Sequence, residues 1–300
     1  MTEGLGPLAV LGGDERQLYM CRALALQGYL VRTWGLPPSA TEAAHFHRCS
    51  TWEEAIRSSR TVILPLPASK DGVHVNAQHV GNEALRLDIL LANLQHKLLL
   101  GGKLSDTVRR MAEENCVRWI DYYDSESLQL KNALATAEGA IEIAMRELPV
   151  TLDRCHAAII GFGRIGELLA QKLGALGVAV TVYARREEAL TRAALYGCSV
   201  APIQTEDGKR IITRIPQTVR LILNTVPQRL LTRSVLQTLP RNCLLIDLAS
   251  APGGVDFQAA QELNLTAIWA TALPGKYAPE SAGTYLAETV ASILSKELYT

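Results

Sequence analysis

A glycine-rich segment at residues 161–166 carries the strongest chemical signal in the sequence. Its glycines follow the pattern Gly-x-Gly-x-x-Gly, after an apolar run at 157–160 and before a helical pattern that ends near Gly177. In a strand–turn–helix unit of this kind, the first glycine permits a tight turn and the second lets a pyrophosphate approach the backbone. The third lets the helix pack closely on the strand. The spacing therefore predicts a dinucleotide-binding loop, with phosphates at the helix N-terminus.

The end of the next predicted strand, at 178–183, indicates which dinucleotide binds. A site for NAD places Asp or Glu there to bind the ribose hydroxyls. This chain has Ala184-Arg185-Arg186 instead. Guanidinium groups at this place favour a 2′-phosphate, because they form charge-assisted and bidentate hydrogen bonds with phosphate oxygens. The sequence predicts NADP as the cofactor; the alternative is that the arginines are solvated and face Glu187 and Glu188.

Two further segments directly follow predicted strands and are expected to line the nicotinamide and ribose. They are Asn224-Thr225-Val226-Pro227 and Asp247-Leu248-Ala249-Ser250. Open parallel sheets bind ligands at the carboxyl ends of their strands. For Asp247, the alternative to a cofactor-binding role is a structural role in the turn. The predicted cofactor-binding residues are Gly161, Phe162, Gly163, Arg164, Ile165, Gly166, Ala184, Arg185, Arg186, Asn224, Thr225, Val226, Pro227, Asp247, Leu248 and Ala249.

Strands that alternate with helices surround these motifs and set the expected fold. Apolar runs stand near 8–11, 29–34, 61–64, 97–100 and 117–120, and a second series stands near 157–160, 178–183, 219–224, 243–248 and 265–270. This alternation indicates mostly parallel sheets with helices on both faces. We expect two α/β domains of Rossmann-like or flavodoxin-like type, with an interdomain cleft.

The expected domain boundaries follow from this order of elements. Residues 1–130 are predicted to form a flavodoxin-like α/β domain, 131–150 a connecting helix, and 151–275 an NAD(P)-binding Rossmann domain. Residues 276–300 are expected to form a helix that packs back on the first domain, since apolar side chains recur there at helical spacing. A chain of 300 residues is consistent with two domains of about 150 residues each.

Composition and charge exclude several classes of protein. Lysine plus arginine number 30 and aspartate plus glutamate number 30, so the formal net charge is zero. Neither nucleic acid nor a membrane surface is therefore an expected partner. No apolar run reaches the roughly 18 residues of a membrane span, and the N-terminus has no secretory signal pattern. The six cysteines lack Cys-x-x-Cys spacing, which predicts reduced thiols in a cytoplasmic protein and no metal site.

Several motifs together resemble the A-subunit family of dipicolinate synthase, an enzyme of spore-forming bacteria, over nearly the whole chain. The most specific are the opening Gly-Gly-Asp-x-Arg-Gln and the late Leu-Pro-Gly-x-x-Ala-Pro. The segments that carry the resemblance are 10–17, 137–139, the 161–166 loop with Ala184-Arg185, 224–227, 246–257, 272–279 and 281–283. Ala251 departs from the pattern, because that position is often basic in the family, and Arg186 is a second departure.

The resemblance implies NADP-dependent oxidation of dihydrodipicolinate to dipicolinate, with a flavoprotein-like B subunit, in the mother cell of a spore-forming bacterium. It also implies a fold like that of the D-2-hydroxyacid dehydrogenases, with the active site in the interdomain cleft. A dicarboxylate needs cationic or N–H donor partners, and Arg16 and Lys276 are expected on the two sides of that cleft. The predicted substrate-binding residues are Gly13, Asp14, Arg16, Gln17, Ser250, Pro274 and Lys276, and the predicted catalytic residues are Glu138 and Ser250. The alternatives are a helix-surface position for Arg16, an exposed loop position for Lys276 and an interdomain structural bond for Glu138.

Two other interpretations stay open. A D-2-hydroxyacid-type dehydrogenase fits the expected fold, but the six histidines lie at 45–96 and 156, away from the segments expected to hold an acid–base histidine. Such an enzyme usually also has arginine where this chain has Ser250-Ala251-Pro252. The other alternative is a non-catalytic NADP-binding partner of the B subunit, which the lack of a clear acid–base pair leaves open. A homo-oligomer is expected, because α/β chains of this class commonly pair.

Overall fold

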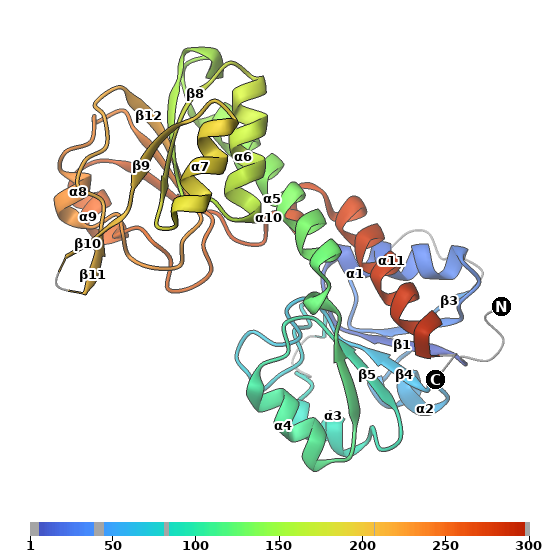
Figure 1. The fold of residues 1–300 in the computed structure, drawn as a ribbon. Coiled ribbons are helices and arrows are strands. Elements are labelled where there is room, and N and C mark those ends of the chain that lie inside the picture. The colour runs from blue at the N-terminus through green and yellow to red at the C-terminus, as the bar shows by residue number, and fades with distance from the viewer. Residues whose placement is uncertain (1–5, 39–44, 81–83, 207, 298–300) are drawn as a thin grey trace. The chain divides into compact units, whose positions relative to one another are not determined.

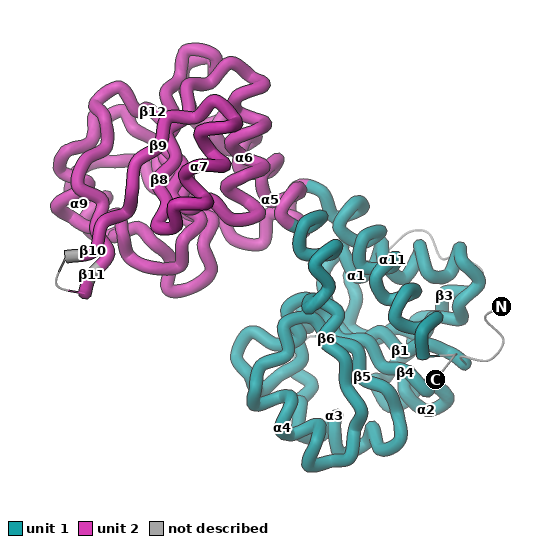
Figure 2. The backbone as a smooth tube through the Cα atoms, in the orientation of Figure 1, with its two compact units in different colours: residues 1–132, 278–300 teal, residues 133–277 magenta. Residues whose placement is uncertain are grey.

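Two compact units, each built on its own parallel sheet, make up the chain (Figures 1 and 2). The computed structural model describes residues 6–38, 45–80, 84–206 and 208–297. Unit 1 comprises residues 1–132 and 278–300, and unit 2 comprises residues 133–277. The predicted class, α/β with mostly parallel sheets, is confirmed.

The sheet of unit 1 has six strands in the order β3-β2-β1-β4-β5-β6, and all neighbouring pairs are parallel. The strands are β1 Leu8–Leu11, β2 Val31–Trp34, β3 Phe46–Arg48, β4 Thr61–Ile63, β5 Leu98–Gly101 and β6 Arg118–Asp121. Parallel strands that are covered on both faces are apolar along their whole length, as β1 is.

Helices cover both faces of this sheet. They are α1 Glu15–Leu26, α2 Trp52–Arg57, α3 Leu87–Ala92, α4 Asp106–Glu114 and α11 Pro279–Glu297, with a 3-10 turn η1 at Tyr122–Asp124. Leu8 and Val10 of β1 pack in one core with α1 and α11. Ala9 and Leu11 point to the opposite face and pack with α2, α3 and α4. Because side chains alternate along a strand, one short apolar run supplies both cores.

The C-terminal helix α11 packs closely on α1 within unit 1. At Gly283 a Cβ atom would lie 2.5 Å from the Arg16 carbonyl oxygen, so the two helix backbones nearly touch there. Leu286, Val290 and Leu294 of α11 are fully buried in the same core. This packing holds the first turn of α1, which carries several of the predicted substrate residues.

The sheet of unit 2 also has six parallel strands, in the order β14-β13-β12-β7-β8-β9. The strands are β7 His156–Ile160, β8 Ala179–Ala184, β9 Ser199–Pro202, β12 Val219–Asn224, β13 Leu244–Asp247 and β14 Thr266–Trp269, with a separate antiparallel hairpin of β10 Gln204–Glu206 and β11 Lys209–Ile211. The helices are α5 Glu126–Glu147, which begins in unit 1, α6 Arg164–Ala175, α7 Glu187–Leu195, α8 Arg233–Leu236, α9 Phe257–Glu262 and α10 Leu273–Tyr277, with a 3-10 turn η2 at Leu152–Arg154.

Both sheets follow the Rossmann order. In this order the first strand lies at the centre, the second and third strands lie on one side of it, and the remaining three strands lie on the other side. In sequence terms each order is 3-2-1-4-5-6, the arrangement of dinucleotide-binding sheets. Unit 1 therefore shares with flavodoxin-like folds the three-layer parallel architecture but not their 2-1-3-4-5 strand order. Each unit has a switch point beside its first strand, where open α/β sheets bind ligands.

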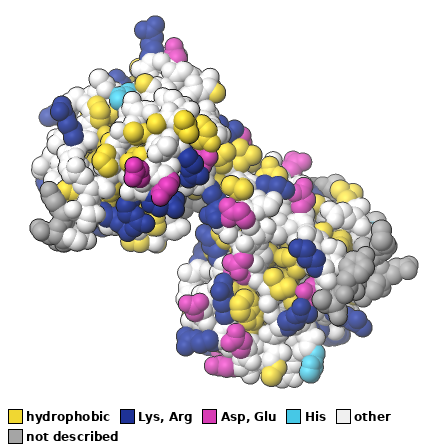
Figure 3. Space-filling view, in the orientation of Figure 1, with side chains coloured by type: hydrophobic (Ala, Val, Ile, Leu, Met, Phe, Trp, Pro, Cys, Tyr) yellow, Lys and Arg dark blue, Asp and Glu magenta, His cyan; other side chains and the backbone are white. Residues whose placement is uncertain are grey.

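The surface mixes charges of both signs, as the balanced composition predicts. Figure 3 shows basic and acidic side chains interspersed over both units on the viewed face, with scattered apolar side chains between them. Within the described ranges, no helix combines the length and the apolar character that a membrane crossing requires.

Candidate functional site

The glycine loop lies at the switch point of unit 2, between β7 and α6. Gly161 has φ +93°, and a Cβ atom there would lie 2.3 Å from Thr225 Oγ1. A Cβ atom at Gly166 would lie 2.2 Å from the Gly161 carbonyl oxygen. Gly163, the N-cap of α6, is different: a Cβ atom there would meet no heavy atom within 4 Å and would enter open space. The first and third glycines thus serve the turn and the packing, and the second leaves room for a ligand against the backbone.

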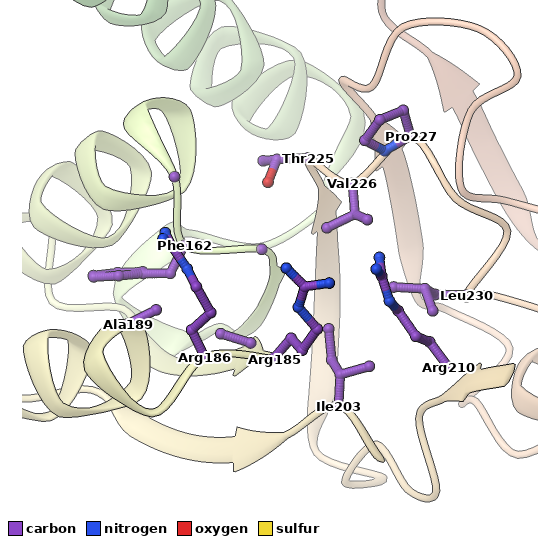
Figure 4. Close-up of a pocket in the computed structure, with 13 residues that line it drawn as sticks. Phe162, Arg185, Arg186, Ala189, Ile203, Arg210, Thr225, Val226, Pro227 and Leu230 are labelled. Carbon is purple, nitrogen blue, oxygen red and sulfur yellow. The ribbon is translucent and has the colours of Figure 1, made fainter. Parts of the chain in front are cut away.

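A pocket of about 260 Å³ opens beside this loop. Figure 4 shows that its walls come from the glycine loop, the junction of β8 with α7, the chain around the β10–β11 hairpin and the segment after β12. The lining residues are Gly161, Phe162, Gly163, Ala184, Arg185, Arg186, Ala189, Ile203, Arg210, Thr225, Val226, Pro227 and Leu230. Nine of the predicted cofactor-binding residues are therefore brought together around one cavity.

Three arginines and no carboxylate stand among the described lining residues. Arg185 and Arg186 are exposed, and within the described part of the chain neither side chain forms an ion pair or a hydrogen bond. They do not engage Glu187 or Glu188, which was the alternative to a phosphate-binding role. In Figure 4 the guanidinium of Arg186 extends toward the glycine loop, and that of Arg185 points into the pocket. The pocket therefore presents unneutralised positive charge to a ligand.

Asn224 and Asp247 lie at the predicted strand ends, but their side chains do not line this pocket. Both are fully buried, and Asn224 Nδ2 donates to Asp247 Oδ1 at 2.7 Å. The Asp247 carboxylate also accepts from the backbone N–H groups of Ala249, Gly254 and Val255, at 2.7 to 3.1 Å. This geometry matches the structural turn role that was the alternative for Asp247.

The other predicted cofactor residues are not among the lining residues of the pocket. They are Arg164, Ile165 and Gly166 in the first turn of α6, and Leu248 and Ala249 after β13. Four lining residues carry no sequence signal that would have indicated them: Ala189, Ile203, Arg210 and Leu230. Among these, Arg210 is charged and comes from the hairpin, a segment without a recognisable motif.

The predicted substrate residues of unit 1 gather at the N-terminus of α1. Asp14 is the N-cap: its carboxylate accepts from the Arg16 backbone N–H, and Gln17 Oε1 accepts from the Asp14 N–H at 3.0 Å. Arg16 donates to both Asp14 oxygens, through Nε at 2.9 Å and Nη2 at 2.8 Å, and Nη2 also donates to Leu66 O at 2.6 Å. Because the Asp14 carboxylate already occupies this helix end, unit 1 does not offer the open phosphate cradle that unit 2 does.

Lys103 is a second cation near Arg16 that the sequence did not indicate. Desolvation lowers the pKa of Lys103, and the positive charge of Arg16 lowers it further, while Asp121 acts in the opposite direction. Its Nζ atom lies 4.9 Å from the centroid of the Tyr123 ring. This edge of unit 1 thus holds two neighbouring cations, and among the described residues only the Arg16 side chain is bonded directly to a carboxylate.

The remaining predicted residues lie in three places of unit 2. Ser250 is exposed in the turn after β13. Pro274 is buried and Lys276 is exposed on α10, a short helix where the sequence indicated a loop. Glu138 of α5 accepts a hydrogen bond from Lys172 Nζ at 2.9 Å and lines a groove with α6, apart from the glycine-loop pocket. Among the described residues, no cluster of three His, Cys, Asp or Glu side chains could hold a metal ion.

The paired Rossmann sheets define the class of fold, which is that of the two-domain dehydrogenases. The solved structure of D-lactate dehydrogenase from Escherichia coli is 13% identical, covers 97% of this chain and 96% of its own, and has a TM-score of 0.64. At this identity the similarity concerns the fold alone.

The family is more specific. The A subunit of dipicolinate synthase from Bacillus subtilis is 31% identical over 99% of this chain and 98% of its own length. The solved structure of the A subunit from Bacillus halodurans is 25% identical, covers 96% of this chain and 97% of its own, and has a TM-score of 0.82. The solved structure of the A subunit from Bacillus subtilis is 27% identical, covers 97% of this chain and 96% of its own, and also has a TM-score of 0.82. The family model for the N-terminal domain of the dipicolinate synthase A subunit matches residues 7–123. The chain belongs to the A-subunit family of dipicolinate synthase, which confirms the resemblance found in the sequence.

Proposed function

We propose that this protein is an oxidoreductase that converts dihydrodipicolinate to dipicolinate with NADP⁺ as hydride acceptor. One observation carries the proposal: the pocket beside the glycine loop presents three arginines and, among its described lining residues, no carboxylate. A pocket that recognised unphosphorylated ribose would instead offer a carboxylate to the ribose hydroxyls. The membership of the A-subunit family supports the choice of substrate and product.

The residues of the pocket fit a dinucleotide. The open space at Gly163 admits a pyrophosphate against the backbone N–H groups at the start of α6, a helix of 12 residues. Arg185 and Arg186 stand where the 2′-phosphate of the adenosine would lie. Thr225 and Val226 form the opposite wall and would contact the ribose and nicotinamide portion. Asn224 and Asp247 would act through the backbone of their segments, which they hold in place by hydrogen bonds.

The proposed reaction balances as a two-electron oxidation. A ring carbon of dihydrodipicolinate loses a hydride, which NADP⁺ accepts when bound, and a second ring position loses a proton. The product is an aromatic pyridine, so the step needs only modest help from a general base. We propose Glu138 and Ser250 as the proton-handling side chains. We propose Gly13, Asp14, Arg16, Gln17, Ser250, Pro274 and Lys276 as the substrate-binding residues. Lys103 joins them as a second cation near Arg16 for a substrate carboxylate.

The cofactor assignment is tested by the variant Arg185→Asp. We expect its affinity for NADPH to fall by about 100-fold, because one or two charge-assisted hydrogen bonds are replaced by repulsion. Its affinity for NADH should change by less than about threefold, since no 2′-phosphate is involved. Arg241→Asp, an exposed arginine outside the pocket, is the matched control for charge reversal. Equal losses for NADPH and NADH would refute the assignment.

The reaction is tested by mixing the purified chain with dihydrodipicolinate and NADP⁺, with the B subunit present or absent. NADPH formation together with the ultraviolet absorption of a pyridine product is the expected result. Reduction of 2-oxo acids with NADPH, in place of this reaction, would favour a D-2-hydroxyacid-type dehydrogenase. NADP binding without turnover, even with the B subunit present, would favour a non-catalytic partner.

The substrate and proton roles are tested by two further variants. Arg16→Ala should raise the Michaelis constant for dihydrodipicolinate without changing NADP⁺ affinity; unchanged kinetics would refute the carboxylate contact. Because Arg16 is buried and forms an ion pair with the half-buried Asp14, the thermal stability of this variant is measured in parallel. Glu138→Gln keeps a hydrogen-bond acceptor for Lys172 but cannot take up a proton, so unchanged turnover would remove Glu138 from the proposal.

A further inference from the structure

The connection between β9 and β12 is unusual for a dinucleotide-binding sheet. In such folds a helix usually links consecutive parallel strands. Here the link contains the antiparallel hairpin β10–β11, which pairs Thr205 with Arg210 and forms a small sheet of its own. The hairpin stands beside the candidate cofactor pocket, as Figure 4 shows.

The base of this hairpin is anchored to the strand that precedes the two pocket arginines. The Ile203 N–H donates to Ala184 O at 2.9 Å, and the Tyr183 hydroxyl donates to Arg214 O at 2.9 Å. Ile203 and Ile212, which flank the hairpin, are buried at 6% and 4% exposure. The hairpin therefore has a fixed attachment to the end of β8, and its position relative to Arg185 is set by the core.

The Arg210 side chain points from the hairpin into the pocket. Its guanidinium is turned toward the same part of the cavity as that of Arg185 in Figure 4, and both residues line the pocket. Arg210 Nη1 donates to Gln228 Oε1 at 2.7 Å, which fixes the orientation of the planar group. A guanidinium has five N–H donors, so this bond leaves four for a ligand. Arg210 is half-buried, whereas Arg185 is exposed.

We propose that Arg210 is a further specificity-determining residue, which binds the 2′-phosphate of the adenosine together with Arg185 and is positioned by Gln228. This inference rests on the proposed function and deepens it. Like charges placed around one cavity repel each other, and a dianionic phosphate monoester would relieve that repulsion and accept hydrogen bonds from both arginines. A ribose with free hydroxyls would leave the repulsion in place. The hairpin thus supplies the third cation of the phosphate site from a part of the chain outside the strand–turn–helix motif.

The test measures the affinities of NADP⁺, NAD⁺, adenosine 2′,5′-bisphosphate and 5′-AMP by calorimetry on the full chain. Arg210→Gln should weaken NADP⁺ and the bisphosphate by about 10-fold or more, because a charge-assisted hydrogen bond is lost. NAD⁺ and 5′-AMP should weaken by less than about threefold. Gln228→Ala should give a smaller loss with the same selectivity, since it removes only the group that orients Arg210.

Arg229→Gln is the matched control for long-range charge, because Arg229 is an exposed neighbour of Gln228 that does not line the pocket. It should change every affinity by less than about twofold. Equal losses of NADP⁺ and NAD⁺ in Arg210→Gln would overturn the phosphate contact and indicate stacking on the adenine. Unchanged affinities would overturn the inference altogether. Failure of this inference can be distinguished from failure of the proposed function. If only the role of Arg210 is wrong, wild-type protein still prefers NADP⁺ and Arg185→Asp still reduces that preference. If the proposed function is wrong, wild-type protein binds neither nucleotide.

Discussion

Asn224 and Asp247 are cross-strand neighbours at the carboxyl ends of β12 and β13, and their fully buried side chains are hydrogen-bonded to each other at 2.7 Å. The same carboxylate receives the N–H groups of Ala249, Gly254 and Val255. A buried carboxylate is stable in a folded protein only when donors satisfy it in this way. The pair therefore ties the turn after β13 to the segment after β12, which forms one wall of the pocket.

The first prediction concerns this carboxylate. Asp247→Asn keeps the size of the side chain but places an NH2 group among the surrounding donors, so the free energy of unfolding should fall by about 3 kcal/mol. Urea denaturation measures this loss. Asp153→Asn, at an exposed position of unit 2, is the control and should change stability by less than about 0.5 kcal/mol. Full stability of Asp247→Asn combined with weakened NADP⁺ binding would show instead that Asp247 contacts the cofactor.

The second prediction separates the roles of two loop glycines. Gly163→Ala should fold normally, because its backbone is extended and a methyl group would enter open space, yet it should weaken NADP⁺ binding by about 10-fold or more by blocking the pyrophosphate. Gly161→Ala should instead lower stability by about 2 kcal/mol or more, through its positive φ and the contact with Thr225. Calorimetric titration and thermal melting measure the two effects.

Gly174→Ala is the control for both variants, since it lies inside α6 with nothing within 4 Å of the added methyl group. It should stabilise the protein slightly, by about 0.5 to 1 kcal/mol, because alanine favours the helix over glycine. Normal NADP⁺ affinity in Gly163→Ala would contradict the assignment of the phosphates to this loop.

The strands that the sequence predicted best are those buried on both faces. The apolar runs at 8–11, 157–160 and 219–224 stand within a residue of β1, β7 and β12. The strands β3 and β9 were missed, because both lie at sheet edges and most of their side chains are exposed. An edge strand is buried on fewer sides, so its sequence lacks the continuous apolar signal on which such predictions depend.

The residues of the candidate site also divide into those that the sequence could predict and those that it could not. The glycine loop could be predicted because its chemistry requires particular residues at fixed local spacing. Arg210 could not, since it reaches the pocket through the tertiary position of a hairpin with no motif. Asp247 was correctly expected at a strand end, but the direction of its side chain depends on donors that converge from the following turn. Local spacing therefore gives the place of a residue along a sheet edge and not what its side chain contacts.

The third prediction concerns the contact between α1 and α11. Gly283→Ala should lower the stability of unit 1 by about 1 to 3 kcal/mol, because the methyl group would lie 2.5 Å from Arg16 O and from Tyr19 Cβ. Thermal melting measures the loss, and NADP⁺ affinity at about 25 °C should stay within about twofold, since all the described lining residues of the pocket belong to unit 2. Ser281→Ala, exposed on the same helix, is the control. Unchanged stability of Gly283→Ala would contradict the close helix contact.

The fourth prediction concerns the pH dependence of stability in unit 2. The His156 ring on β7 bonds through Nδ1 to Thr218 Oγ1 and through Nε2 to Thr181 Oγ1, both at 2.8 Å. Hydroxyl groups can donate to one ring nitrogen and accept from the other, which suits the neutral imidazole. Burial lowers the pKa of His156 below its ordinary value of 6.5, because desolvation penalises the charged form.

The sign of the effect follows from linkage. Since the folded pKa lies below the unfolded one, the unfolded chain binds more protons at acidic pH, and the contribution of His156 to stability is lost as pH falls below about 6.5. His156→Gln should therefore lose more stability relative to wild type at about pH 7.5 than at about pH 5, as urea denaturation at both pH values would measure. A stability gap between His156→Gln and wild type that is the same at both pH values would mean that folding leaves the proton affinity of this ring unchanged.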